Sequence, residues 1–299
     1  MSLWNNKTPL QNMSILQQEL ILPNGSRLSN RIAKSAMSEN ASNKKHAPTP
    51  TLINAYKKWA QGGAGLLITG NIMVDAKALG EPRNVIVEDE KHFELLKAWA
   101  NTVKGTETHL WAQINHPGRQ AMEPINSELL APSAVPLKVG GRKNATKKIP
   151  KALLDKEIQE IIEAFGNTAF ILKKAGFTGV QIHGAHGYLV SQFLSPNSNI
   201  REDQWGGSLE NRARFVIEIY REIRRQVGSD YPIGIKINSA DFQRGGFTEE
   251  ESMKVIQLLG NEGMDLIEIS GGTYERPAMI KGNRKKSTEE REVYFLEYI

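Results

Sequence analysis

The chain has 299 residues, of which 39% are hydrophobic, with a formal net charge of +5 and no cysteine. This length suits one large domain or two small ones, and the lack of cysteine excludes disulfides, thiolate metal sites and iron–sulfur clusters within these residues. The sequence has no long apolar run and no charged-then-apolar leader, so we expect a cytoplasmic protein without a membrane partner.

Two basic runs, at residues 142–151 and 281–286, are the features that could indicate nucleic acid. No nucleic-acid-binding motif accompanies either run. We therefore interpret both as solvated loops and expect no nucleic-acid partner.

The first half of the chain alternates turn, strand and helix signals. Asn24-Gly25 predicts a hairpin turn. Thr49-Pro50 predicts a helix start, with Thr49 as cap and Pro50 at the first helical position, and that helix runs to about residue 61 before two glycines. Asp89 is expected to cap a helix over 90–103. The predicted strands are 31–37, 65–69 and 109–114.

The second half repeats the same alternation after a long irregular excursion over 120–152. Apolar residues at helical spacing predict a helix from about residue 153 to Gly176. Thr248 and Glu251 fit a capping box for a helix that ends near Gly263. A further helix is expected over 209–227 and another at the end of the chain. The predicted strands are 179–182, 233–237 and 266–269.

One strand per helix, repeated six times, indicates an α/β fold with a parallel sheet covered by helices. The pattern alone does not separate a barrel from a doubly wound sheet. The first strand lacks a following Gly-x-Gly-x-x-Gly loop, which a doubly wound nucleotide-binding sheet usually carries. Polar residues instead follow or end several different strands, which favours a barrel with one shared mouth; they are Ser38, Gln113, His183, His186, Tyr188, Lys236 and Ser270.

His183, His186 and Tyr188 form the densest group of titratable residues at a strand end. Two ring N–H groups that converge on one oxygen would polarise a carbonyl or nitro group, and the phenol would act as a general acid. The alternatives are satisfied structural histidines, a packed aromatic ring, or metal ligands. The metal hypothesis, a barrel hydrolase, is disfavoured because no third ligand stands at a matching strand end and the spacing is not that of a helical zinc pair.

Lys236 and Gln113 are weaker candidates. A lysine that ends an apolar strand needs an anionic partner or must extend to solvent. A glutamine amide offers a donor and an acceptor to a heterocycle edge. The polar loop over 199–214 is interpreted as structural, with its charged residues holding the loop and capping the next helix.

Several motifs in order resemble the old yellow enzyme family of FMN-dependent ene-reductases, also labelled NADH:flavin oxidoreductases. Residues 183–189 read His-Gly-Ala-His-Gly-Tyr-Leu, and 199–215 contain Asn-Ile-Arg-Glu-Asp-Gln-Trp-Gly-Gly-Ser-Leu-Glu-Asn-Arg. Gln-Ile-Asn-His-Pro-Gly-Arg at 113–119 and Ile-Ser-Gly-Gly at 269–272 also agree. The resemblance covers about residues 10–299.

This resemblance implies an eight-stranded (β/α)8 TIM barrel with FMN at its mouth and NAD(P)H as reductant. Hydride would pass through the flavin to an activated alkene, so the expected partner is a small-molecule substrate. The resemblance does not decide whether the protein forms a homo-oligomer. By position His183 and His186 would bind the activating oxygen and Tyr188 would protonate carbon. The residues carried over as cofactor-binding are Ala36, Met37, Ser38, Gly70, Gln113 and Lys236; no metal site is implied.

The sequence departs from the family pattern at three positions and at its end. Ser38 stands where Thr or Cys is usual, Trp205 where Tyr is common, and Lys236 where Arg is frequent, which loses the bidentate fork. We expect residues 1–299 to form one FMN-binding barrel domain that is incomplete at its C-terminus, lacking strands 7 and 8. A non-catalytic remnant, or a fragment of a larger flavin and iron–sulfur reductase, are the alternatives.

Overall fold

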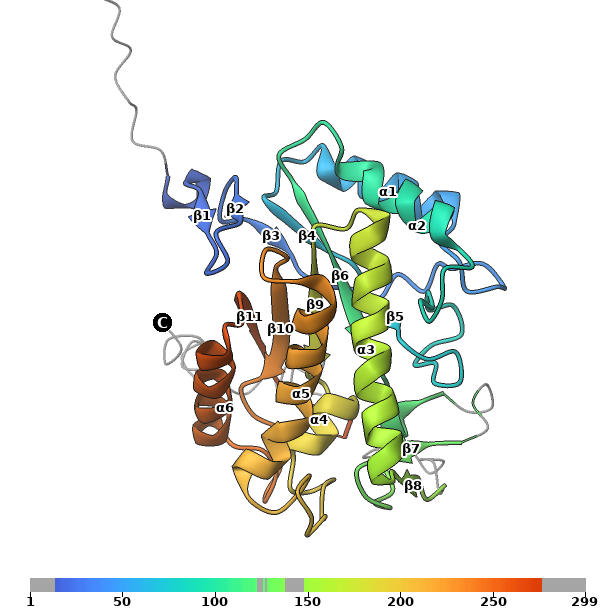
Figure 1. The fold of residues 1–299 in the computed structure, drawn as a ribbon, viewed down its shortest axis with the longest axis vertical. Coiled ribbons are helices and arrows are strands. Elements are labelled where there is room, and N and C mark those ends of the chain that lie inside the picture. The colour runs from blue at the N-terminus through green and yellow to red at the C-terminus, as the bar shows by residue number, and fades with distance from the viewer. Residues whose placement is uncertain (1–13, 123–125, 127, 138–147, 276–299) are drawn as a thin grey trace, which may run out of the picture.

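The computed structural model describes residues 14–122, 126, 128–137 and 148–275. A curled, parallel sheet forms its centre, with the strand order β11-β10-β9-β6-β4-β3, and β5 pairs with β6 beside this path (Figure 1). The strands are β3 (Ala33–Lys34), β4 (Leu66–Ile68), β5 (Ile72–Met73), β6 (His109–Asn115), β9 (Gly179–Gly184), β10 (Ile233–Asn238) and β11 (Leu266–Ser270). The basic run 281–286, most of 142–151 and the expected final helix lie outside the described residues.

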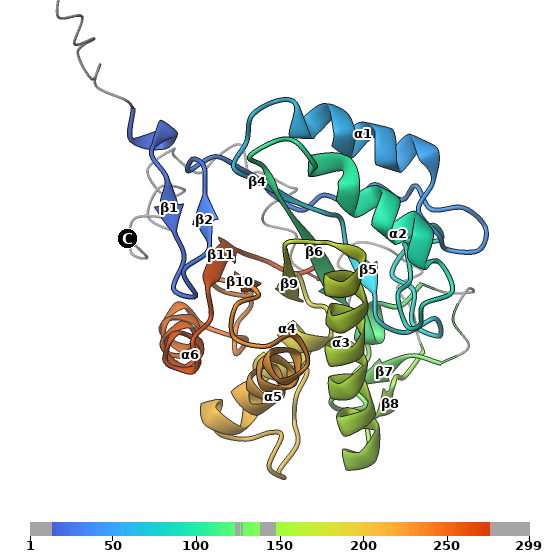
Figure 2. The same cartoon turned by 45° about the horizontal axis from the view of Figure 1, so that its top comes forward.

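Helices cover the outer face of this curled sheet (Figure 2). They are α1 (Pro50–Ala60), α2 (Phe93–Ala100), α3 (Asp155–Ala175), α4 (Leu189–Leu194), α5 (Leu209–Val227) and α6 (Glu249–Glu262), with short 3₁₀ turns η1 (Ile15–Gln17), η2 (Asn101–Val103) and η3 (Gly118–Gln120). The main core lies between the helices and the sheet. Such a layer arrangement buries the apolar stripe of each helix against the strands, as the alternating sequence pattern predicted.

Helix ends follow local sequence chemistry. Thr49 caps α1 by accepting from the Leu52 N–H at 3.3 Å, and Pro50 occupies the first position. Thr248 and Glu251 form the predicted capping box of α6. The predicted cap at Asp89 is wrong, because the Asp89 carboxylate accepts from the backbone of Lys91 two residues on, at 2.9 Å. This local turn delays the start of α2 to Phe93.

Two other predictions differ from the structure. The first strand, predicted over 31–37, is reduced to Ala33–Lys34, so the following residues are free to form a loop at the barrel mouth. Between Gly176 and residue 209, where no helix was expected, the structure has the short helix α4, all of whose residues are buried. Within the predicted excursion, β7 (Leu130–Ala131) and β8 (Lys151–Ala152) pair as a small parallel sheet.

An N-terminal hairpin of β1 (Leu20–Ile21) and β2 (Arg27–Leu28) confirms the turn predicted at Asn24-Gly25. The backbone N–H of Asn24 donates to the carboxylate of Asp265 at 3.0 Å, and its side-chain amide donates to the carbonyl of Asp230 at 3.1 Å. Asp265 immediately precedes β11, so the hairpin is fastened to the amino-terminal end of a strand far along the chain.

The inside of the curled sheet is filled in layers, because every second residue of each strand faces inward. The lowest layer is apolar and centres on the fully buried Trp111. Gly179 and Gly234 make room for its ring, since a Cβ at Gly234 would meet the indole at 2.8 Å, and one at Gly179 would overlap it as well. Two residues further along, the same strands carry polar side chains, and there the candidate site begins.

Candidate active site at the carboxyl ends of the strands

His183, His186 and Tyr188 lie together at the end of β9 and in the turn that leads into α4. The His183 ring centroid is 5.1 Å from that of His186 and 4.8 Å from that of Tyr188. Both contacts are edge-to-face, with interplanar angles of 82° and 76°. Three residues that lie within six positions of the sequence therefore form one compact cluster.

The backbone of His186 is held in an uncommon conformation. Its φ of 63° lies in the left-handed region, which is costly for a side chain other than glycine, and Gly187 follows with a φ of 76°. Asn238 accepts from the His186 N–H at 3.1 Å, and Gln120 donates to the His186 carbonyl at 3.1 Å. The imidazole Nε2 lies 2.7 Å from the hydroxyl of Ser270, at the end of β11. Asn238 and Gln120 thus hold the His186 backbone, and Ser270 orients its ring.

Both histidines are neutral at pH 7. Burial, followed by the charges of His186 and Lys236, holds the pKa of His183 well below its ordinary value. Burial and the Lys236 charge lower the pKa of His186 to about 4, although Glu268 opposes them. Nδ1 of His183 accepts from the Ala185 N–H at 3.3 Å, which places the ring hydrogen on Nε2. His183 consequently presents an uncharged N–H donor.

Tyr188 is buried, with 6% of its surface exposed. Its phenolic oxygen lies 3.2 Å from that of Tyr274, which is 47% exposed. Burial, and then the neighbouring Tyr274, raise the pKa of Tyr188 well above its ordinary value. Tyr188 therefore stays protonated near neutral pH and can act as a proton donor. Sequence reasoning missed Tyr274, which follows the last strand through Gly271-Gly272 and carries no motif of its own.

A connected polar layer lies beside this cluster, inside the sheet. Lys236, whose side chain is almost fully buried, is 3.0 Å from a carboxylate oxygen of Glu268 and 3.0 Å from the Ser35 hydroxyl. Glu268 also accepts from the Gln181 amide at 2.8 Å, and the Gln181 carbonyl accepts from the Gln113 amide at 2.8 Å. The anionic partner that a buried lysine requires is thus Glu268, and Lys236 does not extend to solvent.

Ser35, Gln181 and Glu268 were not among the sequence candidates. The signal that could have found Gln181 and Glu268 is strand register: Lys236 pairs with Glu268, and Gln113 pairs with Gln181, across neighbouring strands. A polar residue at every second position of an otherwise apolar strand points into a barrel, and such residues meet in layers.

The segment after β3 carries Ala36, Met37 and Ser38. Ala36 packs against the inner apolar cluster, Met37 is exposed, and the Ser38 hydroxyl donates to the carboxylate of Glu81. Gly70 lies against this segment, because a Cβ there would overlap the carbonyl oxygen of Met37 and the carboxylate of Glu39. The structure therefore brings these four predicted residues to one wall of the mouth.

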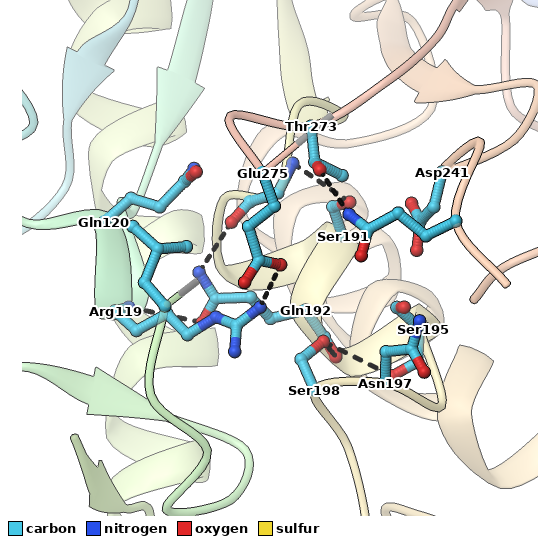
Figure 3. A pocket seen from close by; sticks show the side chains of 13 residues that line it. Arg119, Gln120, Ser191, Gln192, Ser195, Asn197, Ser198, Asp241, Thr273 and Glu275 are labelled. Atoms are coloured by element: carbon cyan, nitrogen blue, oxygen red, sulfur yellow. Dashed lines mark hydrogen bonds and ion pairs between the residues drawn. The ribbon is translucent and has the colours of Figure 1, made fainter. Parts of the chain in front are cut away.

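A narrow recess, with room for about one water molecule, lies behind the His186–Gly187 turn (Figure 3). On one side Arg119 forms a 2.9 Å ion pair with Glu275, and both side chains are largely buried. On the other side Gln243 donates to the Thr273 hydroxyl at 2.7 Å. These contacts fasten the residues on either side of Tyr274, so the recess supports the position of the second tyrosine.

The loop over 199–214 is held by hydrogen bonds and ion pairs within itself and to its neighbours, which agrees with the structural role expected from the sequence. The Asn199 amide donates to the carbonyls of Phe193 and Trp205, at 2.8 Å each. Arg201 pairs with Asp203, and Arg212 pairs with Glu251 of α6. Trp205 is fully buried, and its indole N–H donates to Asp155 at 2.6 Å. The loop joins α4 to α5.

Within the described part of the chain, no helix is both long and apolar enough to cross a membrane. Over the same residues, no group of three histidine, aspartate or glutamate side chains lies close enough to hold a metal ion.

The sequence was compared with known protein families and solved structures. Residues 22–296 match the model of the NADH:flavin oxidoreductase / NADH oxidase family. The chain belongs to this family. Its relatives include an NADH-dependent flavin oxidoreductase of Hypocrea jecorina, strain QM6a, which is 36% identical over 297 residues. The alignment covers 92% of this chain and 73% of that protein.

Other relatives of the family are considerably longer. NADH oxidase of Thermoanaerobacter brockii is 37% identical over 262 residues, which cover 85% of this chain but 39% of that protein. Among solved structures, the old yellow enzyme homologue from Zymomonas mobilis superimposes with a TM-score of 0.77. It is 20% identical, and the match covers 95% of this chain and 86% of that one, which shows a shared fold.

These matches confirm the family expected from the motifs and the (β/α)8 barrel class, of which the described residues form a curled part. They also confirm that the NADH:flavin oxidoreductase family uses FMN with NAD(P)H as reductant. The donor set present suits such a cofactor: an ammonium at Lys236, a side-chain amide at Gln113, and backbone brought close by Gly70 are the groups that a charged, heterocyclic ring edge requires. Individual contacts with FMN stay predictions.

Proposed function

We propose that this chain forms the active site of an FMN-dependent oxidoreductase that uses NAD(P)H to reduce an activated alkene, such as an enone or nitroalkene. The observation that carries the proposal is the cluster of two neutral imidazoles and one protonated phenol, in which the His183 ring centroid is 5.1 Å from that of His186 and 4.8 Å from that of Tyr188. Such a reduction needs two hydrogen-bond donors to the substrate oxygen and one proton donor to the substrate carbon. FMN, when bound, supplies hydride transfer between the nicotinamide and the substrate.

The cofactor would be held by residues that line the mouth. Lys236 offers a positive charge to the ring, and Gln113 offers an amide to its polar edge. Ala36, Met37, Ser38 and Gly70 would provide the backbone and the small side chains of the adjoining wall. The buried position of Lys236 keeps its charge from being screened by water, so it stabilises negative charge nearby more than an exposed lysine would.

His183 and His186 would bind the oxygen of the activating carbonyl or nitro group. Because both rings are neutral, each contributes a hydrogen bond without adding a positive charge that the site would have to compensate. Negative charge that develops on the substrate oxygen strengthens these hydrogen bonds, so the pair favours the transition state over the ground state. The Ser270 contact and the backbone constraints on His186 keep that ring oriented.

Tyr188 would donate its proton to the carbon next to the activating group, after hydride has reached the neighbouring carbon. Its raised pKa keeps the proton on oxygen until a strongly basic carbon forms. Tyr274 would then return a proton, because its hydroxyl touches that of Tyr188 and its ring reaches solvent.

Titration of the purified chain with FMN, followed by anaerobic addition of NADH or NADPH and then of a simple enone or nitroalkene, tests the proposal. We expect a bound flavin spectrum, bleaching by the nicotinamide, and return of the spectrum with the alkene. Bound flavin that is bleached but not restored by any activated alkene would refute the substrate class. Failure to bind FMN would refute the proposal for this chain.

A further inference from the structure

Glu268 stands at one end of a hydrogen-bonded chain that crosses the inside of the barrel. It begins at the Glu268 carboxylate, continues through the amide of Gln181 at 2.8 Å, and ends at the amide of Gln113, again at 2.8 Å. Gln113 and Gln181 are essentially fully buried, so water does not compete strongly for these groups. Each link is therefore set by what its neighbour can accept or donate.

The chemistry of the carboxylate gives this chain a direction. An ionised carboxylate only accepts hydrogen bonds, so Gln181 must turn its NH₂ toward Glu268 and its carbonyl oxygen toward Gln113. Gln113 must then turn its own NH₂ toward Gln181, which leaves its carbonyl oxygen for a different partner. The Lys236 ammonium, at 3.0 Å, and the Ser35 hydroxyl also donate to Glu268, so its carboxylate oxygens act as acceptors toward all three neighbours.

We propose that Glu268 is a positioning residue: through Gln181 it fixes the amide orientation of Gln113, and so makes Gln113 present a carbonyl oxygen to the bound heterocycle. This inference rests on the proposed flavin function, and it adds the reason why the amide accepts instead of donating. The pyrimidine edge of a flavin carries one N–H between two carbonyl groups. An amide with a fixed acceptor recognises that N–H, whereas an amide free to turn over would lose part of the recognition.

Glu268→Gln is the decisive substitution, because it keeps the shape and adds a donor. A glutamine at this position can donate to the Gln181 carbonyl, which would reverse Gln181 and then Gln113. The hydrogen-bonded series from residue 268 to Gln113 would then run in two directions instead of one. Glu268→Asp keeps the acceptor-only character and serves as the conservative variant, and Glu94→Gln, at an exposed position of α2, is the matched control.

The first readout needs no cofactor. With ¹⁵N-glutamine labelling, the side-chain NH₂ signals of Gln113 and Gln181 are assigned by their loss in Gln113→Met and Gln181→Met. We expect both signals to shift or split in Glu268→Gln, and to stay close to wild type in Glu268→Asp and Glu94→Gln. Unchanged Gln113 and Gln181 signals in a folded Glu268→Gln protein would overturn the proposal. If Glu268→Gln does not fold, Gln181→Met decides, because breaking the middle link must alter the Gln113 signal.

The second readout uses FMN and its N3-methyl analogue, which lacks the ring N–H. We expect Glu268→Gln to weaken FMN binding about 3- to 10-fold, the loss of roughly one hydrogen bond, and to narrow the preference for FMN over the analogue by a similar factor. An undiminished preference would contradict the orientation role. If the wild-type protein binds neither compound, the function proposed above fails. The amide signals still decide whether Glu268 sets the orientation of Gln181 and Gln113.

Discussion

The phenolic oxygens of Tyr188 and Tyr274 lie 3.2 Å apart, although one residue belongs to the turn after β9 and the other follows β11. The first is buried and the second is half exposed. The Arg119–Glu275 ion pair fixes the residue next to Tyr274. If Tyr188 is the proton donor proposed above, this contact gives it a hydroxyl-bearing neighbour at the surface through which a proton would return.

Replacing Tyr188 with phenylalanine should separate the two half-reactions. Removal of the phenolic proton should slow alkene reduction about 10²–10⁴-fold, the usual contribution of a general acid, while bleaching of bound FMN by NAD(P)H should continue at the wild-type rate. Anaerobic stopped-flow absorbance measures each step separately. Tyr220→Phe, at a buried tyrosine of α5, is the control and should change neither rate. Equal rates in wild type and Tyr188→Phe would exclude the acid role.

Tyr274→Phe should slow alkene reduction less than Tyr188→Phe, because the second tyrosine acts only through the first. The variant Tyr188→Phe/Tyr274→Phe should therefore be no slower than Tyr188→Phe alone. The measurement is the rate of flavin reoxidation by the alkene in all three proteins. Additive losses would show that Tyr274 works independently of Tyr188.

Lys236 and Glu268 should be strongly coupled in stability. Lys236→Met leaves a carboxylate without its cation inside the sheet, and we expect a loss of about 3 kcal/mol in the free energy of unfolding. Adding Glu268→Gln to Lys236→Met should restore part of that loss. A double-mutant cycle by urea denaturation measures the coupling.

The ion pair between Arg225 and Glu222, with the arginine side chain 67% exposed, provides the comparison for that cycle. Its coupling should be much smaller than that of Lys236 and Glu268, because solvent screens an exposed pair. Similar coupling energies for the two pairs would mean that Lys236 and Glu268 are screened by solvent after all.

Stability should fall on acidification through the titration of buried histidines. A histidine whose pKa is lower in the folded protein than in the unfolded chain stabilises the fold above the unfolded value, and this stability is lost as the pH falls toward the folded value. For His186 the window runs from about pH 6.5 to about pH 4, and the loss is about 3 kcal/mol at most. His116, whose pKa burial lowers to about 4, should contribute in the same window.

Thermal unfolding followed between pH 8 and pH 4 tests this expectation. His186→Gln should flatten the profile between pH 6.5 and 4, because the substituted side chain does not titrate. A wild-type profile without a slope in this range would show that the folded and unfolded pKa values are alike.

Gly70→Ala should disturb the wall of the mouth. The added Cβ would overlap the Met37 carbonyl and the Glu39 carboxylate, so we expect a loss of about 1–3 kcal/mol in stability and weaker FMN binding. Gly260→Ala is the matched control, because that glycine lies in α6 with no atom within 4 Å of an added Cβ. It should stabilise the chain by up to about 1 kcal/mol. Wild-type FMN affinity in Gly70→Ala would remove Gly70 from the site.

The sequence predicted the elements better than the contacts between them. Local signals located α1, α5 and α6, since caps and periodicity act within a few residues. The two histidines and Tyr188 could be found because they share one strand end. Glu268 was missed although it interrupts an apolar strand, because its partner Lys236 is known only once β11 lies beside β10. Tyr274 could not be found, because its importance depends on how the chain after β11 curves back to Tyr188, which no local pattern encodes.

The predictions that failed have local physical causes. Asp89 was assigned as a helix cap from residue type alone, yet the same carboxylate closes a tight turn just as readily. The helix α4 was missed because it is short and wholly buried, and so shows no apolar stripe. The first strand was predicted over 31–37 but spans Ala33–Lys34, because the apolar content of a segment does not show where its backbone leaves the sheet.

The bond between Asn24 and Asp265 joins residues 241 positions apart. During synthesis on the ribosome the hairpin that carries Asn24 emerges early, but its partner emerges only after nearly the whole sheet has been translated. Leu22 and Leu28 of that hairpin, which are buried in the inner apolar cluster of the folded protein, must therefore stay in water, beside other nascent apolar segments, until the sheet is in place. The interval is one in which a chaperone that shields the amino-terminal segment would improve the yield of folded protein.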